Sequence, residues 1–361
     1  MKRKQLEKVI VGMCFTSMLV VTVCGSSSAV ASTVAKKSEA AQTTSNGVTM
    51  KGDGSTVDAA DFDTNVTPNG DYTIAVVVKS AAIPVWESHI IAARKAGEDL
   101  GVEILDYSPT KADNVEEQKR ILEDLITTGV DAVVLAPANT EAVEGPVQDL
   151  IDAGIPVIYD NTMGPSNVDY LTYVGIDNEL CGAMIAEQMA EKIGGKGKMV
   201  IMEGVPGQST SDIRKEGALN TLGEYPDIEV ESAVTNWQSD EGRKVAEDYI
   251  TKWGNDLSAL VAIGGNQAEG AVEAVKAANM QDIVKVSGFD VQEPQYTAVK
   301  NGDEVFTVSQ GVYYQAYYSV VAAVKALNGE TVPSNINCPI TIVTQDNLDE
   351  MDERPDAIQN K

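Results

Sequence analysis

Apolar and polar positions follow a pattern along the chain that is clearest at residues 72–101. Residues 73–78 form an unbroken apolar or β-branched run, as a strand buried on both faces requires. Val85 and Ile90 then change the apolar spacing toward the helical period, which predicts a helix. A strand followed by a helix is the first half of a βαβ unit, and such units build parallel sheets. Open parallel sheets bind ligands at the carboxyl ends of their strands, where residues 79–86 lie.

The same alternation continues along the rest of the chain, with short loops between the segments. Further strands are predicted at residues 102–105, 132–135, 156–159, 170–174, 198–202, 229–234, 259–263, 284–287 and 305–308. Helices are predicted at residues 115–128, 142–153, 179–193, 213–222, 240–253, 270–278 and 295–301. A run of βα units predicts an α/β fold with parallel sheets flanked by helices.

A faint internal repeat indicates two similar lobes. Residues 131–160 and residues 258–290 each contain a buried strand, a helix and a second strand. The second strand of each copy ends in an aromatic residue followed by an aspartate, Asp160 in one copy and Asp290 in the other. If the two lobes face each other, both acids are expected to enter one cleft.

Composition narrows the classes of function. The chain has 361 residues and 43% hydrophobic content, so two globular domains are expected. Its 27 basic and 54 acidic residues predict a surface that repels polyanions, which argues against nucleic-acid binding. His89 is the single histidine, and the four cysteines show no C-x-x-C spacing. The sequence therefore predicts neither a metal site nor a cofactor.

The first residues have the pattern of a secretory signal. Residues 1–8 carry four basic side chains and one acid, and residues 9–23 are uncharged and largely apolar. The apolar stretch is shorter than the roughly 20 residues of a spanning helix. Residues 1–24 are therefore expected to direct export.

The processing of this signal has open alternatives. Residues 21–24, Val-Thr-Val-Cys, resemble a bacterial lipobox, although Val23 occupies a position where a small residue is usual. Lipidation of Cys24 would anchor the protein to a membrane. Residues 29–31, Ala-Val-Ala, offer an ordinary cleavage site after Ala31 instead. An uncleaved anchor is the third outcome.

Residues 25–70 have the composition of a flexible tether. They are rich in Ser, Thr, Ala, Asp and Asn, with scattered Gly. Such a stretch buries too little apolar surface to offset its ordering entropy. We therefore expect it to connect the export signal to the folded body.

Enzymatic motifs are missing or incomplete in the sequence. The glycines and lysines at residues 194–198 lack the spacing of a phosphate-binding loop, and Gly264 and Gly265 are not part of a G-x-G-x-x-G pattern. No G-x-S-x-G elbow occurs, and His89 has no obvious serine or cysteine partner. No catalytic residue is predicted from these motifs.

The polar and aromatic residues at strand ends and in loops suit a ligand rich in hydroxyls. A sugar ring presents an apolar face to aromatic side chains and its hydroxyls to planar carboxylate, amide and guanidinium groups. Residues of these types occur at Trp86, Asp160, Asn161, Arg214, Trp237, Asn266, Asp290 and Gln310, and Lys79 ends the first long strand. We expect these nine side chains to form the ligand site.

Residues 72–344 resemble the ribose-binding-protein group of periplasmic-type solute-binding proteins (periplasmic binding protein type 1), which deliver sugars to ABC importers. The resemblance is carried in order by Ile-Ala-Val-Val-Val at 74–78, Ile-Tyr-Asp-Asn at 158–161, Gly-Ile-Asp-Asn at 175–178, Ser-Asp-Ile-Arg at 211–214, Val-Ser-Gly-Phe-Asp at 286–290 and Thr-Val-Ser-Gln at 307–310. It implies a binding role for the predicted site residues.

In the first lobe, Trp86 corresponds to one of the family's two stacking aromatics, and Val85 leaves the other half of that clamp absent. Asp160 corresponds to the acid that binds ring hydroxyls, while Asn161 replaces the arginine that often follows it. Lys79 is similar to a cation of relatives that bind other sugars or furanose-type signalling molecules.

In the second lobe, Arg214 corresponds to a family arginine, Trp237 to a stacking aromatic and Asp290 to the strand-end acid. Asn266 lies close to a family asparagine, and Gln310 corresponds to a glutamine near a hinge. Ile83 and Ala136 stand where ribose binders use asparagine, which favours a sugar other than ribose.

The resemblance further implies two similar lobes, each a parallel sheet flanked by helices, joined by a three-strand hinge. The implied crossovers lie near Gly175, Gln310 and Thr341, and the implied lobes are residues 71–176 plus 311–340 and residues 177–310 plus 341–361. Ligand binding would close the lobes by hinge motion.

The function implied by the resemblance is capture of a monosaccharide or related small polyol outside the cytoplasm. The expected partners are the permease of an ABC importer and, if Cys24 is modified, the membrane; the protein itself is expected to be a monomer. A sensor of a furanose-type signal or a chemoreceptor partner is an alternative on the same fold. An exported carbohydrate enzyme with Asp160 and Asp290 as a carboxylate pair is a third.

Overall fold

The computed structural model describes residues 47–352 and residue 358, which belong to one compact unit. The export signal, Cys24, Ala31 and the first part of the predicted tether lie outside the described residues. Within the described part of the chain, no helix combines the length and apolarity needed to cross a bilayer.

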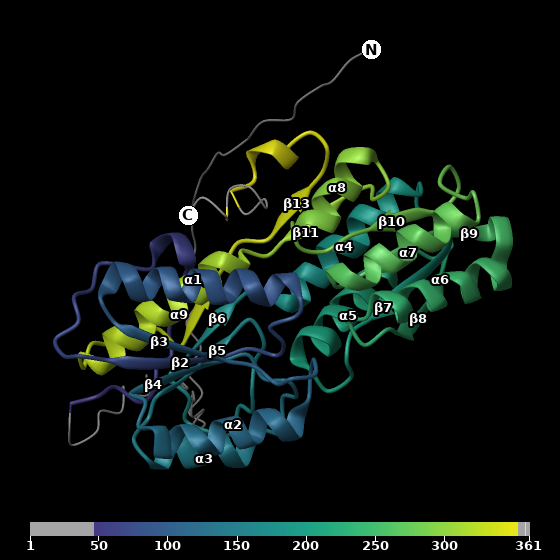
Figure 1. The fold of residues 1–361 in the computed structure, drawn as a ribbon. Helices are drawn as coiled ribbons and strands as arrows, with labels where there is room; N and C mark the ends of the chain where they lie inside the picture. Colours follow the sequence, from purple (N-terminus) through teal and green to yellow (C-terminus); the bar gives the residue numbers. More distant parts are fainter. Residues whose placement is uncertain (1–46, 353–357, 359–361) are drawn as a thin grey trace, which may run out of the picture. The chain divides into compact units, whose positions relative to one another are not determined.

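The larger sheet has seven strands in the order β1-β12-β6-β5-β4-β2-β3, all parallel. The strands are β1 (Thr56–Asp58), β2 (Thr73–Val77), β3 (Glu103–Tyr107), β4 (Ala132–Leu135), β5 (Val157–Asp160), β6 (Thr172–Gly175) and β12 (Asn335–Asn337). Helices α1 (Pro84–Leu100) and α9 (Val312–Leu327) lie on one face, and α2 (Val115–Thr128) and α3 (Glu144–Asp152) lie on the other (Figure 1).

Alternate residues of β2 explain why this sheet is covered on both faces. Ile74 and Val76 belong to the core formed with α1 and α9, whereas Ala75 and Val77 pack with Leu122 of α2 and its neighbours. These four side chains of β2 are all buried. A strand covered on both faces needs the unbroken apolar run that the sequence shows.

The smaller sheet has four parallel strands in the order β10-β9-β7-β8. The strands are β7 (Gly197–Glu203), β8 (Ile228–Val234), β9 (Leu257–Ala262) and β10 (Lys285–Ser287). Helices α4 (Asn178–Lys192) and α5 (Ser209–Leu222) pack as one pair, and α6 (Ser239–Trp253) and α7 (Gly265–Ala277) as another (Figure 1). Helix α8 (Glu293–Asn301) contacts α7.

Helices α4 and α5 approach closely at two glycines. A Cβ atom on Gly182 of α4 would collide with the backbone oxygen of Arg214, and one on Gly217 of α5 would collide with the backbone oxygen of Glu179. Only glycine lets the two backbones lie at this separation. This packing fixes α5, which carries Arg214.

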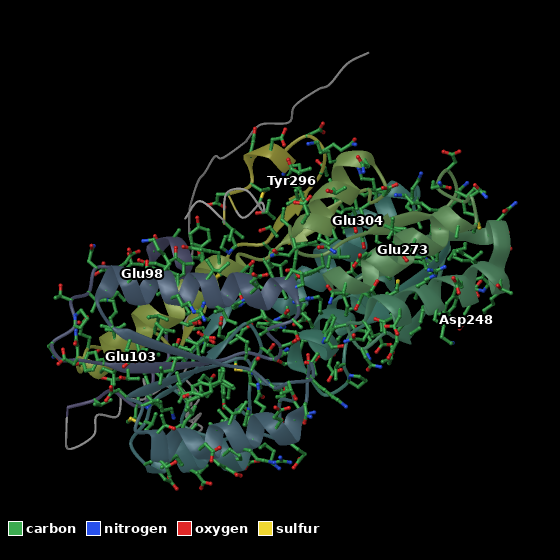
Figure 2. The ribbon with its side chains drawn as sticks, in the orientation of Figure 1. Glu98, Glu103, Asp248, Glu273, Tyr296 and Glu304 are labelled. Atoms are coloured by element: carbon green, nitrogen blue, oxygen red, sulfur yellow. The ribbon has the colours of Figure 1, made fainter. Side chains whose placement is uncertain are left out.

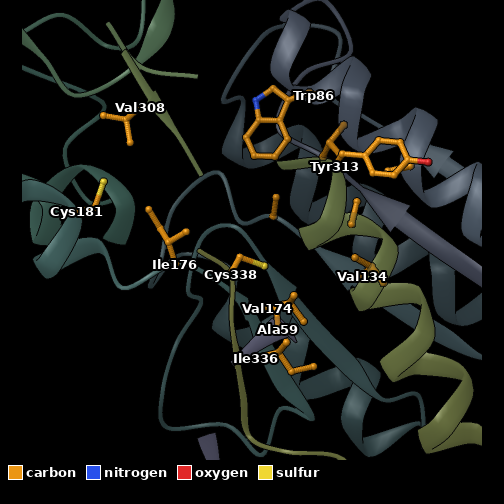
Figure 3. Packing of buried hydrophobic residues seen from close by; sticks show 14 of the residues in the cluster. Ala59, Trp86, Val134, Val174, Ile176, Cys181, Val308, Tyr313, Ile336 and Cys338 are labelled. Carbon is orange, nitrogen blue, oxygen red and sulfur yellow. The ribbon is translucent and has the colours of Figure 1, made fainter. Parts of the chain in front are cut away.

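Short links connect the two groups of elements. The chain leaves the larger sheet after Gly175, returns to it after β11 (Thr307–Ser309), and leaves again between β12 and β13 (Thr341–Val343). β11 and β13 pair antiparallel as a separate two-stranded sheet. The apolar core continues from Val134 and Val174 through Ile176 to Val308 (Figure 3). The lobe boundaries stay a prediction, but the chain passes between the sheets close to the three implied crossovers.

The later part of the predicted tether is structured. β1 pairs with the edge strand β12, and Met50 and Phe62 are buried. The Phe62 ring meets the Tyr318 ring of α9 edge-on, with 6.0 Å between centroids. The expectation of a flexible segment up to residue 70 is therefore wrong for this part. A few apolar residues of this otherwise polar stretch pack against the larger sheet and α9. The average composition of the stretch does not reveal such contacts.

The surface of the described chain is strongly acidic, as the sequence composition predicts. Glu98, Glu103 and Asp248 are exposed on helices and strands of both sheets (Figure 2). Some of the described basic side chains pair with acids on the same helix, as Lys244 does with Asp248.

Candidate ligand-binding site

A cavity lies between the carboxyl ends of the two sheets. Its walls come from loops that follow β2, β5, β8, β9 and β10 and from the start of helices α1 and α5. It is lined by eight of the nine predicted site residues: Lys79, Trp86, Asn161, Arg214, Trp237, Asn266, Asp290 and Gln310.

Lys79 follows β2 and brings a buried cation to the cavity. Its Nζ donates to Oε1 of Gln208 at 2.9 Å and lies 5.4 Å from the centre of the Trp86 ring. Burial lowers the pKa of Lys79 to about 8; Asp113 opposes this shift and Arg214 adds to it. The ammonium retains N–H groups that could donate to a ligand.

Arg214 is a second buried cation, held by neutral partners. Its Nε and Nη2 donate to Oδ1 of Asn178 at 3.2 and 2.6 Å, and its Nη1 donates to the carbonyl of Ile263 at 2.6 Å. The guanidinium lies 4.0 Å from the centre of the Phe289 ring. Burial lowers the pKa of Arg214, against the effect of nearby groups that include Asp290. The group is thus fixed in orientation before any ligand arrives.

Asp290, Gln310 and Asn161 form a connected polar wall. Gln310 Nε2 donates to Asp290 Oδ1 at 2.7 Å, and Asn161 Nδ2 donates to Gln310 Oε1 at 3.2 Å and to Gln315 Oε1 at 3.0 Å. Burial raises the pKa of Asp290 to about 6, while the Gln310 hydrogen bond and Arg214 oppose the rise. Planar groups in one network can each meet two hydroxyls of a ring.

The internal repeat is shifted by one residue in the structure. Asn161 and Asp290 both have left-handed backbones, with φ of 61° and 66°. Their N–H groups donate to the equivalent carbonyls of Val174 and Val308, at 2.9 and 2.7 Å. Asn161 therefore takes the place in the larger sheet that Asp290 takes in the smaller one. Asp160 corresponds instead to the fully buried Phe289.

Asp160 does not line the cavity, so the expectation that both acids enter one cleft is wrong. Its carboxylate lies 3.6 Å from Nε2 of His89, and both side chains are buried. The imidazole Nδ1 is 3.0 Å from the carbonyl of Val85, which requires a proton on Nδ1. Burial raises the pKa of Asp160 well above its ordinary value and lowers that of His89 to about 4. The pair supports Trp86, whose ring centre is 4.8 Å from that of His89.

Trp237 enters the cavity through space left by glycines. Its backbone φ is 59°, and a Cβ atom on Gly264 would lie 2.5 Å from the indole. A Cβ atom on Gly204 would also collide with the ring. The indole Nε1 donates to Gln208 Oε1 at 2.8 Å, and Asn266 Nδ2 donates to the carbonyl of Trp237 at 3.3 Å. Gly264 thus accommodates an aromatic side chain.

Several residues of the site were not predicted from the sequence. Phe289 and Asp113 line the cavity, and Gln208 bonds three of the residues that do, namely Lys79, Asp113 and Trp237. Phe289 could have been found, because it directly precedes a predicted site residue. Gln208 lies in a loop before a helix, where nothing in the hydrophobic pattern marks it. In the stretch from 47 to 352, no group of acidic, histidine or cysteine side chains could hold a metal ion.

Residues 74–331 match the model of the periplasmic binding protein domain. The chain belongs to this family. The D-ribose/D-allose-binding protein of Pseudomonas aeruginosa is 30% identical over 283 residues, which are 75% of this chain and 88% of the relative. The xylitol-binding protein of Mycolicibacterium smegmatis is 30% identical over 237 residues, 65% of this chain and 67% of the relative.

Solved structures of periplasmic binding proteins share the fold. A solute-binding protein of an ABC transporter from Actinobacillus succinogenes, with bound D-allose, has a TM-score of 0.74 and 28% identity over 78% of this chain and all of that one. A protein from Bacillus halodurans with bound myo-inositol has a TM-score of 0.73 and 26% identity over 79% of this chain and 98% of that one. The predicted fold class and the resemblance to sugar-binding proteins are confirmed.

Proposed function

We propose that this periplasmic binding protein captures a monosaccharide or small polyol in the cavity, outside the cytoplasm, and delivers it to an ABC importer. The observation that carries the proposal is the joint placement of two indoles, Trp86 and Trp237, with fixed planar hydrogen-bonding groups at the carboxyl ends of two parallel sheets. Relatives that bind D-ribose, D-allose and xylitol support the ligand class.

The chemistry of the walls suits a neutral ring. Trp86 and Trp237 offer apolar faces for the C–H groups of a sugar. Asn161, Asp290 and Arg214 are held by hydrogen bonds in fixed directions, so a ligand finds them already oriented. Preorganised groups lose little conformational entropy on binding, which favours affinity.

The location and assembly that we propose follow from the family and the sequence. The protein is exported and acts as a monomer without catalytic chemistry, and ligand binding closes the two lobes around the three links between the sheets. Lipidation of Cys24 anchors it beside the permease; cleavage after Ala31 releases it instead. Mass spectrometry of the exported protein distinguishes these two outcomes by the mass of its N-terminal fragment.

Thermal unfolding of the exported chain tests the ligand class. The probes are D-ribose, D-allose, xylitol and myo-inositol, each compared with the ligand-free protein. A ligand at 100 times its dissociation constant adds about 2.7 kcal/mol to the free energy of unfolding, which gives a clear rise in the melting temperature. We expect at least one compound to produce this rise.

The matched variants are Asp290→Asn in the cavity and Asp248→Asn on the exposed surface of α6. The rise should persist in the surface variant and shrink in the cavity variant. Equal melting temperatures with and without all four compounds would contradict the proposed ligand class.

A further inference from the structure

We propose that Gln208 is a positioning residue that bridges the two sides of the cavity and orients Lys79 and Trp237 toward the ligand. This inference rests on the proposed function, because it assigns Gln208 a part in ligand capture. Gln208 is fully buried and does not line the cavity. It precedes α5 at the N-cap position, yet its side chain makes no capping hydrogen bond to that helix.

The carboxamide of Gln208 has all its hydrogen-bonding capacity in use. Its Oε1 accepts from Lys79 Nζ at 2.9 Å and from Trp237 Nε1 at 2.8 Å. Its Nε2 donates to Asp113 Oδ1 at 2.6 Å and to the carbonyl of Ala138 at 2.9 Å. A primary amide offers two acceptor and two donor sites, so these four bonds saturate it.

The four partners lie on opposite sides of the cavity. Lys79 follows β2, Asp113 precedes α2 and Ala138 follows β4, so all three belong to the larger sheet and its helices. Trp237 follows β8 of the smaller sheet, as Gln208 itself precedes α5 on that side. Separation of the sheets would break three of the four bonds and keep the one to Trp237.

The neighbours of Gln208 extend this bridge. The carbonyl of Gly207 accepts from the N–H of Thr140 at 2.9 Å. The N–H of Ser209 donates to Thr140 Oγ1 at 2.9 Å, and its hydroxyl donates to the carbonyl of Met163 at 3.1 Å. These contacts fix the backbone at the start of α5, and the Gln208 carboxamide connects that backbone to three side chains of the cavity wall, those of Lys79, Asp113 and Trp237.

Glutamine is the side chain that this environment requires. Leucine would leave Lys79 Nζ and Trp237 Nε1 without their acceptor. Glutamate would still accept from both, but it could not donate to Asp113 or to the carbonyl of Ala138, and it would place a second carboxylate beside Asp113. The effect of Gln208→Glu on ligand release should therefore be reduced by adding Asp113→Asn, because this second change removes one carboxylate and supplies an amide donor.

The first measurement is the rate of ligand dissociation, followed by stopped-flow tryptophan fluorescence with D-ribose, D-allose, xylitol and myo-inositol. In Gln208→Leu we expect dissociation to be at least about tenfold faster, since bonds to a charged group are lost. The matched control is Gln238→Leu, because Gln238 precedes α6 at the same helical position and its side chain donates to the carbonyl of Asn236 in its own loop. The control should release ligand at the unaltered rate.

The second measurement needs no ligand. The three tryptophans give three indole N–H resonances, and that of Trp237 should exchange with solvent faster in Gln208→Leu while that of Trp253 stays unchanged. This readout separates the proposed ligand class from the proposed role of Gln208. If none of the four compounds binds, that result counts against the ligand class, and indole exchange still tests the role of Gln208.

Two results would overturn the inference. One is an unaltered dissociation rate and unaltered Trp237 exchange in a folded Gln208→Leu variant. The other, decisive if that variant fails to fold, is additive behaviour of Gln208→Glu and Asp113→Asn. Direct contact between the two side chains predicts that the double variant regains part of the lost residence time, although the bond to the Ala138 carbonyl stays lost; independent structural damage would give no recovery.

Discussion

At the residue scale, the site depends on polar groups that are buried before a ligand arrives. Asp290 is the clearest case, because its carboxyl accepts from Gln310 and lies near Arg214, yet burial still raises its pKa to about 6. The folded protein therefore holds a charge that would be more stable in water at neutral pH. Such a cost is expected where a side chain serves binding rather than stability.

The raised pKa of Asp290 predicts a pH-dependent gain of stability in Asp290→Asn. The native carboxyl keeps its proton up to about pH 6, whereas in the unfolded chain it ionises near 3.8. The free energy of unfolding therefore falls as the pH rises from about 3.8 to about 6, because over this range the unfolded chain releases the proton that the folded chain retains. The variant should be more stable at pH 7 by on the order of 1–3 kcal/mol, and this difference should vanish near pH 4. Chemical denaturation across that pH range measures it.

A loss of stability in Asp290→Asn at pH 7 would contradict the assignment. The same variant should bind ligand more weakly, so stability and binding are expected to change in opposite directions.

The location of most cavity-lining residues at strand ends could be predicted from the sequence. Side chains that follow buried parallel strands must reach the same sheet edge, and Trp237, Asp290 and their neighbours line one cavity in the structure, while their contact with a ligand stays a prediction. The prediction that Asp160 enters the cavity was wrong, because a one-residue shift in the repeat turns its side chain toward His89 and the core. Gln208 could not be predicted, since its role depends on partners up to 129 residues away.

At the scale of elements, strongly periodic or continuously apolar segments were predicted with the greatest accuracy. The strand Ala132–Leu135 and the helix Val115–Thr128 have the predicted bounds. Helix α9 was missed because nearly all residues from Ser319 to Leu327 are buried, which removes the polar face that marks a surface helix. β12 and β13 are three residues each, too short for a periodic signal.

The segment before β2 is a structural element of the larger sheet, which leads to a prediction for Phe62. Its ring is buried and meets Tyr318 of α9. Phe62→Ala should lower the free energy of unfolding by about 3 kcal/mol, through lost burial and the cavity that remains. Asp61→Ala, at the exposed neighbouring position, is the control and should change stability little. Equal stability of both variants would show that this segment contributes nothing to the fold.

At the scale of the molecule, two parallel sheets present their carboxyl ends to a shared cavity. We propose that backbone rotation at the short links 176–177, 310–311 and 338–340 changes the width of this cavity. Hydrogen bonds from Lys79 to Gln208, from Ser209 to Thr140 and from Ser88 to Gln292 connect the elements of the larger sheet with those of the smaller one. We propose that these contacts break when the lobes separate and form again when they close.

The central claim is that this cavity binds one sugar-like ring for each chain, and isothermal titration calorimetry tests it most directly. Titration of the exported protein with D-ribose, D-allose, xylitol and myo-inositol should give, for at least one of them, a stoichiometry of one. A micromolar dissociation constant would correspond to about −8 kcal/mol. Trp237→Ala should weaken that binding at least about tenfold, because the stacking face is lost. Unchanged binding in that variant, or no binding of any of the four compounds, would contradict the account.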